Sequence, residues 1–517
     1  MIEIQNVSYS YQEDGADQSL KHIDLKIQDG ECVLLCGKSG CGKTTITRLL
    51  NGMIPNFYEG AVTGQVLLDG QNLLDLPMFE ISKKVGTVFQ NPRTQFYTVN
   101  TTSEIAFGCE NMGMQREKII ERVRQTAEDL QIEYLLNRNI FALSGGEKQI
   151  VAFASIYAMS PQVYVLDEPS SNLDVQAIEK IRKILVLLKQ QGKTIVIAEH
   201  RTYYLKDLVD RAVYLDSGEI VREYSMSELA GFTVQEQLER GIRTVDLLHY
   251  PVKPYVAPAT CEKIQIDNLS FSYGKEENLH IGHMEIPSGH ITAIIGTNGA
   301  GKSTFVSCLC GLLKKAKGNF TLSEKPFRTK ERLRQSYLVM QEVNHQLFSD
   351  SVQEEIVLGV KEPSDSQLKT ITDALDITGL YDRHPMTLSG GQKQRVIIAS
   401  AMFCGKRILF FDEPTSGLDF THMMRTCELL KGLQEKDTFL FIITHDFEFI
   451  ASVCDSVIHI EHGEVIEQYD LDTKGVEQLE RFFSYSMGKH HEAPSIGRGL
   501  FRGHTDVAKE KRHGTLC

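Results

Sequence analysis

The sequence predicts an α/β fold built from two copies of one domain, each with a mostly parallel sheet. Three observations support this prediction. A glycine-rich segment of the form G-x-x-x-x-G-K-[S/T] occurs at residues 37–44 and again at residues 296–303. An LSGG tetrapeptide begins at Leu143 and again at Leu388. In both copies short apolar runs alternate with helical patterns, which is typical of a parallel sheet covered by helices.

The expected elements follow in the same order in each copy. An alternating strand opens the copy, a buried strand enters the glycine-rich loop, a helix leaves the loop, and a helical stretch precedes LSGG. In the first copy these are residues 2–11, 32–36, 43–51 and 115–136; in the second they are 264–273, 291–295, 302–311 and 366–377. In the first copy Asp69-Gly70 also predicts a hairpin turn.

The motif spacing indicates a duplication. Four pairs of residues lie 245 positions apart: Ser144 and Ser389, Asp167 and Asp412, Asp174 and Asp419, and His200 and His445. Lys43 and Lys302 lie 259 positions apart, so the first copy is longer between its glycine-rich loop and LSGG. We predict a first domain over residues 1–245, a Pro-bearing linker over 246–262, a second domain over 263–470 and a partly disordered C-terminal tail over 471–517.

Composition excludes several classes of protein. The 517 residues are 42% hydrophobic and 24% charged, which argues against a fibrous or wholly disordered chain. The net charge of −13 disfavours non-specific nucleic-acid binding, and we expect no nucleic-acid partner. No apolar run approaches the ~18 residues that a membrane span needs, and no signal peptide is expected. The 11 cysteines show no C-x-x-C spacing, so we expect reduced, buried thiols.

The glycine-rich loops predict phosphate binding. Glycines allow backbone N–H groups to surround an anion, and the positive end of the following helix faces the phosphates. In this pattern Lys43 and Lys302 reach the β- and γ-phosphates, while the Thr44 and Ser303 hydroxyls bind Mg²⁺. The residues expected to contact nucleotide are Gly37, Lys38, Ser39, Gly40, Cys41, Gly42, Lys43, Thr44 and Thr45, and Gly296, Thr297, Asn298, Gly299, Ala300, Gly301, Lys302, Ser303 and Thr304.

Two apolar runs end in adjacent carboxylates, Asp167-Glu168 and Asp412-Glu413. Such a pair at a strand end is usually a solvated turn, but here each pair follows a glycine-rich loop along the chain. We therefore expect the aspartates to hold the Mg²⁺ shell. The glutamates are expected to orient or polarise the attacking water as catalytic residues.

These motifs resemble those of the ATP-binding-cassette (ABC) ATPases, in which LSGG is the signature. The resemblance implies two P-loop NTPase ABC domains, each with a mostly parallel sheet core, an antiparallel β subdomain and an α-helical signature subdomain. It also implies an intramolecular pseudo-dimer in which each nucleotide is sandwiched between the two copies. Lys43 would share ATP with Ser389, Gly390 and Gly391 (site 1), and Lys302 would share ATP with Ser144, Gly145 and Gly146 (site 2).

Further positions match the family pairwise. The resemblance makes Tyr11 and Tyr273 adenine-stacking aromatics, Gln90 and Gln341 nucleotide and Mg²⁺ contacts, His200 and His445 catalytic switch histidines, and Asp174 and Asp419 interface aspartates. The implied Mg²⁺ ligands are Thr44, Gln90 and Asp167 in site 1, and Ser303, Gln341 and Asp412 in site 2. Three departures can make the sites unequal: Glu147 follows LSGG, Asn172 replaces the glycine found at Gly417, and Glu199 stands where Thr444 stands. We expect two competent sites.

Residues 90–96 (QNPRTQF), residues 105–114 (IAFGCENMGM) and the string 199–201 resemble the ATPases of energy-coupling-factor (ECF) transporters. The resemblance implies an ATPase peripheral to the cytoplasmic side of the cell membrane that energises uptake of a vitamin or metal ion. Its partners would be an integral coupling subunit and a substrate-binding membrane subunit in separate chains. The alternative is a soluble tandem ABC ATPase acting on ribosomes, although such proteins usually carry a long basic linker.

Overall fold

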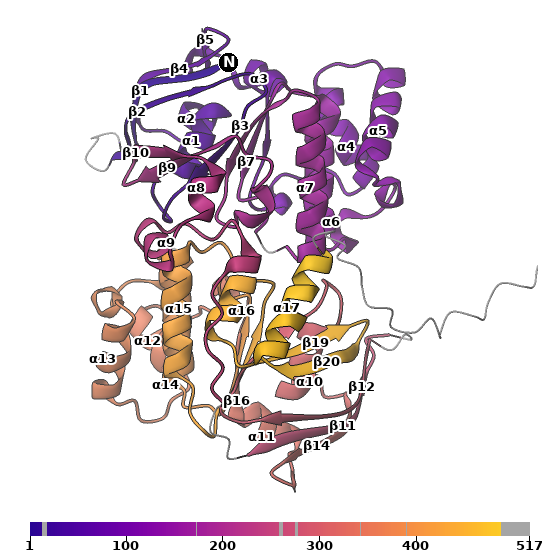
Figure 1. The fold of residues 1–517 in the computed structure, drawn as a ribbon, viewed down its shortest axis with the longest axis vertical. Helices are drawn as coiled ribbons and strands as arrows, with labels where there is room; N and C mark the ends of the chain where they lie inside the picture. Colours follow the sequence, from indigo (N-terminus) through magenta and orange to yellow (C-terminus); the bar gives the residue numbers. More distant parts are fainter. Residues whose placement is uncertain are drawn as a thin grey trace, which may run out of the picture.

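The computed structural model describes residues 1–12, 18–171, 173–257, 262–274, 278–341, 343–388 and 390–486. Within these residues each half of the chain forms two sheets with helices around them, and the halves lie one above the other in Figure 1. The predicted α/β fold with two similar halves is confirmed. Predictions about Asn172, Ser389 and residues 487–517 concern positions outside the described residues.

The first half contains an antiparallel sheet and a larger, mostly parallel sheet. Its strands are β1 (Ile2–Ser10), β2 (Gln18–Ile27), β3 (Cys32–Cys36), β4 (Ala61–Leu68), β5 (Gln71–Asn72), β6 (Val85–Val88), β7 (Val163–Asp167), β8 (Thr194–Ala198), β9 (Arg211–Asp216) and β10 (Glu219–Tyr224). The antiparallel sheet has the order β2-β1-β4-β5 and the larger sheet the order β10-β9-β3-β8-β7-β6. Only β10 runs antiparallel to its neighbour in the larger sheet.

The second half repeats this arrangement strand for strand. Its strands are β11 (Lys263–Phe271), β12 (Leu279–Pro287), β13 (Ile291–Ile295), β14 (Lys317–Leu322), β15 (Lys325–Pro326), β16 (Ser336–Val339), β17 (Ile408–Asp412), β18 (Phe439–Ile443), β19 (Ser456–Glu461) and β20 (Glu464–Asp470). The sheet orders β12-β11-β14-β15 and β16-β17-β18-β13-β19-β20 match those of the first half. The structure therefore agrees with the duplication inferred from motif spacing.

The central strands β3 and β13 are buried at every position. Their residues, CVLLC and ITAII, are almost all apolar because helices and the antiparallel sheet cover both faces of each central sheet. Each of these strands runs directly into a glycine-rich loop, so the buried centre of each half carries the phosphate-binding segment.

The helices of the first half are α1 (Lys43–Leu50), α2 (Met53–Asn56), α3 (Met78–Lys84), α4 (Thr101–Asn111), α5 (Arg116–Leu130), α6 (Gly145–Met159), α7 (Val175–Gln190), α8 (Met226–Ala230) and α9 (Val234–Arg240). Those of the second half are α10 (Lys302–Cys310), α11 (Thr329–Gln335), α12 (Val352–Val357), α13 (Asp365–Ala374), α14 (Gly390–Phe403), α15 (Phe420–Gly432), α16 (Phe447–Val453) and α17 (Thr473–Ser486). Helices α4–α6 and α12–α14 lie on opposite sides of the molecule (Figure 1), so the halves are arranged head to tail.

Two helices tie the halves together. Helix α9 packs against α15, and α17 packs against α7. The chain after α9 continues along the second half, where Leu247 and Tyr250 join the hydrophobic core. Helix α17 contributes Leu479 and Phe483 to the same core, although it falls within the segment 471–517 that the sequence analysis assigned to a tail. The predicted domain boundaries stay predictions.

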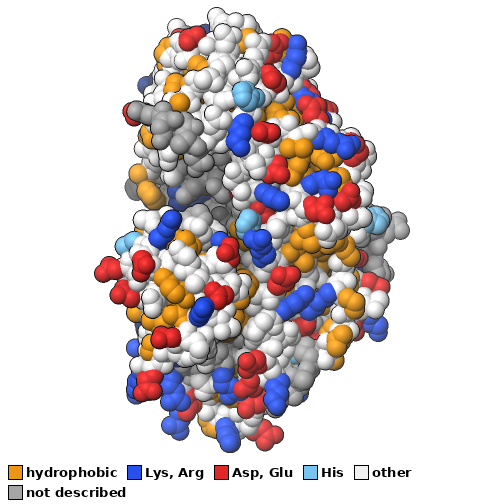
Figure 2. All heavy atoms as spheres, turned by 90° about the vertical axis from the view of Figure 1, so that its left-hand side faces the viewer, with side chains coloured by type: hydrophobic (Ala, Val, Ile, Leu, Met, Phe, Trp, Pro, Cys, Tyr) orange, Lys and Arg blue, Asp and Glu red, His pale blue; other side chains and the backbone are white. Residues whose placement is uncertain are grey.

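The described surface is mixed in charge. Acidic and basic side chains alternate over both halves on the face drawn in Figure 2, with scattered hydrophobic groups between them. None of the helices in the described ranges is both long and apolar enough to cross a lipid bilayer.

Two candidate nucleotide sites between the halves

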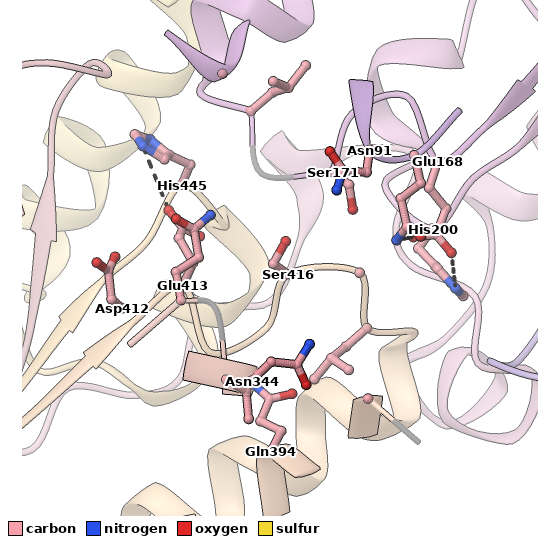
Figure 3. A pocket seen from close by; sticks show the side chains of 18 of the residues that line it. Asn91, Glu168, Ser171, His200, Asn344, Gln394, Asp412, Glu413, Ser416 and His445 are labelled. Atoms are coloured by element: carbon pink, nitrogen blue, oxygen red, sulfur yellow. Dashed lines mark hydrogen bonds and ion pairs between the residues drawn. The ribbon is translucent and has the colours of Figure 1, made fainter. Parts of the chain in front are cut away.

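A cleft of about 1570 Å³ lies between the halves and is lined by both of them. It brings together most of the residues that the sequence singled out, and Figure 3 shows the catalytic candidates facing its interior. The predicted residues that line it are Tyr11, Ser39, Gly40, Gly42, Lys43, Thr44, Thr45, Gln90, Gly145, Glu168, His200, Tyr273, Asn298, Gly299, Gly301, Lys302, Ser303, Thr304, Gln341, Gly390, Gly391, Asp412, Glu413 and His445.

Other predicted residues lie beside the cleft without lining it: Gly37, Lys38, Cys41, Ser144, Gly146, Asp167, Gly296, Thr297 and Ala300. Cys41 and Ala300 are buried under their loops, so their side chains pack inward. The first glycine of each loop lets the loop pass close to a backbone carbonyl of a neighbouring strand. A Cβ at Gly37 would lie 2.2 Å from the Leu215 carbonyl oxygen, and one at Gly296 would lie 1.9 Å from that of Ile460. Only glycine fits these positions.

The loop lysines are held in the same way in both halves. The Lys43 ammonium donates to the carbonyls of Gly37 at 2.9 Å and Lys38 at 3.0 Å. The Lys302 ammonium donates to the carbonyls of Gly296 at 2.8 Å and Thr297 at 2.9 Å. Both lysines therefore lie curled inside their own loops, with the positive charge close to the backbone N–H groups that would face phosphate.

Each loop also supplies a hydroxyl beside a carboxylate. Thr44 Oγ1 donates to Asp167 Oδ1 at 3.1 Å. In the second half burial raises the pKa of Asp412 to about 6, with the Lys302 charge and a hydrogen bond from Ser303 opposing the rise. Hydroxyl and carboxylate oxygens are hard ligands of the kind that Mg²⁺ prefers, so these residues fit that ion. Among the described residues no group of three or more His, Cys, Asp or Glu side chains is placed to hold a metal ion.

A glutamate and a histidine face each other in both sites (Figure 3). His200 Nε2 lies 3.6 Å from Glu168 Oε1, and His445 Nε2 lies 3.7 Å from Glu413 Oε1. Burial lowers the pKa of both histidines well below the usual value, so they are neutral near pH 7. In site 1 Gln90 also approaches this pair, because its Nε2 donates to Glu168 Oε2 at 2.6 Å.

The two glutamates have raised pKa values for the same main reason. Burial, reinforced by the charges of Glu199 and Asp167, raises the pKa of Glu168 to about 8. Burial raises the pKa of Glu413 to about 7, although the Arg201 charge opposes the rise. A carboxylate whose pKa lies near the working pH can accept a proton from water and act as a general base.

The interface aspartates cross from one half to the loop of the other. The backbone N–H of Ser39 donates to Asp419 Oδ2 at 2.6 Å, and that of Asn298 donates to Asp174 Oδ2 at 2.7 Å. The two contacts are equivalent under the pseudo-symmetry of the halves. Each glycine-rich loop is therefore fastened to the opposite half, which places both nucleotide sites at the junction.

The signature segments begin helices that point at this junction. Ser144 caps α6: its hydroxyl accepts from the Glu147 N–H at 3.2 Å, and the Glu147 carboxylate accepts from the Ser144 N–H at 2.9 Å. Glu147, a departure from the family pattern, thus completes a capping box. In the second half Gly390 and Gly391 open α14 and line the cleft.

Sequence reasoning missed several cleft residues. Lys148 and Lys393 line the cleft at the same position after LSGG, and their repetition in the two copies was the available signal. Arg48 does not line the cleft itself, but it holds Tyr11, which does, and it was also missed. Its Nη1 donates to the Tyr11 hydroxyl at 2.7 Å, and its guanidinium lies 4.0 Å from the centre of the Tyr58 ring. No motif marks that cluster, because Tyr58 belongs to a segment that the second copy lacks.

The family model for the ABC transporter matches residues 20–171 and 279–416 of the chain. The chain belongs to the ABC transporter family. A Treponema denticola protein provisionally named as an ABC transporter ATP-binding protein is 42% identical over 90% of this chain and 97% of its own length. A Bacillus subtilis protein provisionally named as an HMP/thiamine import ATP-binding protein is 31% identical over 89% of each chain.

Solved structures agree on the fold. The archaeal ribosome recycling factor aABCE1, in complex with the stalk protein aP1, superposes with a TM-score of 0.63 at 24% identity, over 91% of this chain and 90% of that one. At this identity the likeness concerns the fold alone. This ABC protein is an ATPase, and ABC ATPases bind ATP with Mg²⁺. Its two ABC domains form a pseudo-dimer within one polypeptide.

Proposed function

We propose that this ABC ATPase is the energy-coupling subunit of an ECF-type importer, peripheral to the cytoplasmic side of the membrane. Its two ATP sites would drive uptake of a small solute, a vitamin or a metal ion, through an integral coupling subunit and a substrate-binding subunit. The observation that carries the proposal is the paired contact of Ser39 with Asp419 and of Asn298 with Asp174, which joins each phosphate-binding loop to the opposite half. The import function printed in the name of the Bacillus subtilis relative supports the direction of transport.

In this proposal the predicted residues act at the positions described above. The loop lysines bind the β- and γ-phosphates, and the Gly390 and Gly145 helix starts cover the γ-phosphate from the opposite half. Glu168 and Glu413 accept a proton from the attacking water, while the neutral histidines hold the γ-phosphate and the glutamate in place. Mg²⁺, when bound, neutralises charge on the phosphate oxygens. Cleavage removes the phosphate that joins the halves, and the halves separate.

Exposed apolar side chains suggest where a membrane subunit docks. After Gln90 the chain exposes Tyr97 and Val99, and Val99 hydrogen-bonds the segment that carries exposed Phe141. After Gln341 it exposes Phe348 and Leu358, which line a groove of about 400 Å³. Exposed aromatic groups at equivalent positions of both halves are typical of a protein-binding surface.

Co-purification tests the proposal. The native protein should extract with membranes and bring integral membrane proteins with it. The variants Tyr97→Asp and Phe348→Asp should release those companions while ATP binding stays unchanged, because neither residue contacts a glycine-rich loop. Val221→Asp on the edge strand β10, where Val221 is 60% exposed, is the matched control. Retention of the companions by both variants would refute this docking surface, and recovery of ribosomes instead would favour the ribosome-associated alternative.

A further inference from the structure

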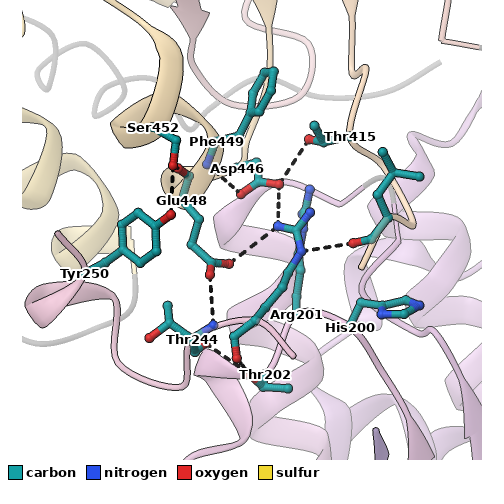
Figure 4. A network of polar contacts seen from close by, with 12 residues as sticks. His200, Arg201, Thr202, Thr244, Tyr250, Thr415, Asp446, Glu448, Phe449 and Ser452 are labelled. Carbon is teal, nitrogen blue, oxygen red and sulfur yellow. Dashed lines mark hydrogen bonds and ion pairs between the residues drawn. The ribbon is translucent and has the colours of Figure 1, made fainter. Parts of the chain in front are cut away.

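A buried arginine, Arg243, lies in the connecting segment, residues 225–257, which leads from β10 to the second half. It follows α9, and its side chain is only 1% exposed. Its partners Asp446 and Glu448 are labelled in Figure 4. Its Nη1 lies 2.5 Å from Asp446 Oδ2 and 3.5 Å from Glu448 Oε2. Its Nε donates to the Leu418 carbonyl at 3.0 Å. One side chain of the connecting segment thus binds two separate segments of the second half.

Both of these segments lead to a nucleotide site. Asp446 directly follows His445, the switch histidine of site 2. Leu418 directly precedes Asp419, whose carboxylate accepts the Ser39 N–H in the loop of site 1. Arg243 therefore contacts the chain one residue away from a functional side chain in each site.

In the first half a different arginine, Arg201, makes the equivalent contact. Arg201 directly follows His200, and its Nη1 donates to the Leu173 carbonyl at 3.3 Å. Leu173 precedes Asp174, which accepts the Asn298 N–H in site 2. Leu173 and Leu418 are equivalent positions, 245 residues apart, so each interface segment has a buried arginine on its leucine carbonyl. The position equivalent to Arg201 is Asp446, an acid that cannot donate to this carbonyl.

The guanidinium chemistry of Arg243 favours a role in holding its hydrogen-bond partners at fixed positions. A guanidinium presents its donors in a rigid plane and can bind a carboxylate and a carbonyl at fixed relative positions. Asp446 is held from a second side by Thr415 Oγ1 at 3.1 Å, and Glu448 Oε1 accepts the Thr244 N–H at 2.8 Å. The connecting segment is thus anchored through main chain and side chain, and Arg243 supplies the positive charge that these buried carboxylates require.

We propose that Arg243 is a positioning residue for ATP hydrolysis at both sites. It takes in the second half the place that Arg201 takes in the first, and it holds the Leu418–Asp419 segment and the His445–Asp446 segment in register. The connecting segment then contributes directly to the geometry needed for ATP hydrolysis. The proposal concerns the ATPase alone and does not depend on the membrane partners.

Steady-state hydrolysis by the full chain tests this role. Arg243→Met should lower kcat about 10- to 100-fold, the range expected when a distant change misplaces catalytic groups. KM for ATP should stay about the same, because Arg243 does not line the cleft. Arg240→Met, in the same connecting segment, is the control and should match the parent protein, because Arg240 donates only to the Glu236 carbonyl and the Tyr224 hydroxyl within the first half.

Two further variants separate positioning from folding. Arg243→Lys keeps the charge and cannot bridge both acceptors, so it should fold with a smaller loss of melting temperature than Arg243→Met and turn over several-fold more slowly than the parent protein. Arg243→Ala should regain turnover when guanidinium is added at millimolar concentration to the folded protein. The proposal is overturned if folded Arg243→Met has the wild-type kcat. If Arg243→Met fails to fold, a wild-type kcat in Arg243→Lys overturns it instead. A kcat loss that guanidinium leaves unchanged and that tracks a lowered melting temperature also overturns it.

Discussion

The two nucleotide sites carry the same set of motifs, and one of the differences between them is the residue before the switch histidine. In site 1 this residue is Glu199, a buried carboxylate that accepts from the N–H groups of His200 and Ser170 and from the Tyr204 hydroxyl. In site 2 it is Thr444, whose hydroxyl donates to Glu413 Oε2 at 3.4 Å. The Thr444 hydroxyl also accepts the Asp446 N–H at 3.2 Å. The comparison teaches that a motif can be intact while the group behind it changes from an acceptor alone to an acceptor that also donates to the catalytic glutamate.

The difference extends across the interface. The Glu199 charge raises the pKa of Glu168, second only to burial, whereas the Arg201 charge lowers the pKa of Glu413. Glu199 and Arg201 flank His200 in the same segment of the first half. One segment therefore makes the base of site 1 harder to ionise and the base of site 2 easier to ionise.

Removing the two catalytic glutamates should have the largest effect on ATP hydrolysis. Glu168→Gln with Glu413→Gln should lower phosphate release by about 10²- to 10⁴-fold, the usual contribution of a general base. ATP binding should persist, because the amide has the shape of the carboxylate. The single variants, assayed side by side, show which site carries more turnover. Hydrolysis at the parent rate in both single variants and in the double variant would contradict the assignment of either glutamate.

The sequence predicted the local part of the sites well. Glycine-rich loops, strand-end carboxylates and capped helix starts are encoded by neighbouring residues, so spacing alone locates them. The contacts of Arg243 with Asp446 and Leu418 join residues some 200 and 175 positions apart, and no local pattern specifies such a pairing. The effect of Glu199 on Glu168 depends in the same way on burial that only the folded chain creates.

Helix α17 illustrates the same limit. Its position after the second sheet gave no motif to follow, and it lies in a segment predicted as a tail. In the structure Leu479 and Phe483 pack into the core of the second half, and α17 also contacts α7. The amphipathic spacing of these residues was the available signal.

The pH dependence of kcat should differ between the two sites, and we expect this difference to be of intermediate size. Glu413→Gln leaves site 1 as the active site and Glu168→Gln leaves site 2. The base works only when ionised, so kcat should fall as pH drops through its pKa. Because burial and the Glu199 charge raise the pKa of Glu168, whereas the Arg201 charge opposes the rise for Glu413, the midpoint for site 1 should lie at the higher pH.

Replacing Glu199 identifies the cause of that offset. Glu199→Thr in the Glu413→Gln background removes the neighbouring charge and should move the midpoint of site 1 toward that of site 2. Thr444→Ser in the Glu168→Gln background keeps the hydroxyl and is the control. Coincident midpoints for the two sites, or an unmoved midpoint after Glu199→Thr, would contradict the electrostatic account.

The smallest expected difference lies at the adenine end of the sites. In site 1 Arg48 holds the Tyr11 hydroxyl and stacks on Tyr58, whereas Tyr273 in site 2 is 68% exposed and the position equivalent to Arg48 is Ser307. Arg48→Ser should therefore weaken ATP binding at site 1 about two- to fivefold, the value of one exposed cation–π contact. Labelling with a photoreactive ATP analogue, followed by mapping to each half, measures this separately for the two sites. Ser307→Ala is the control. Equal labelling of both halves before and after Arg48→Ser would show that Arg48 does not strengthen ATP binding at site 1.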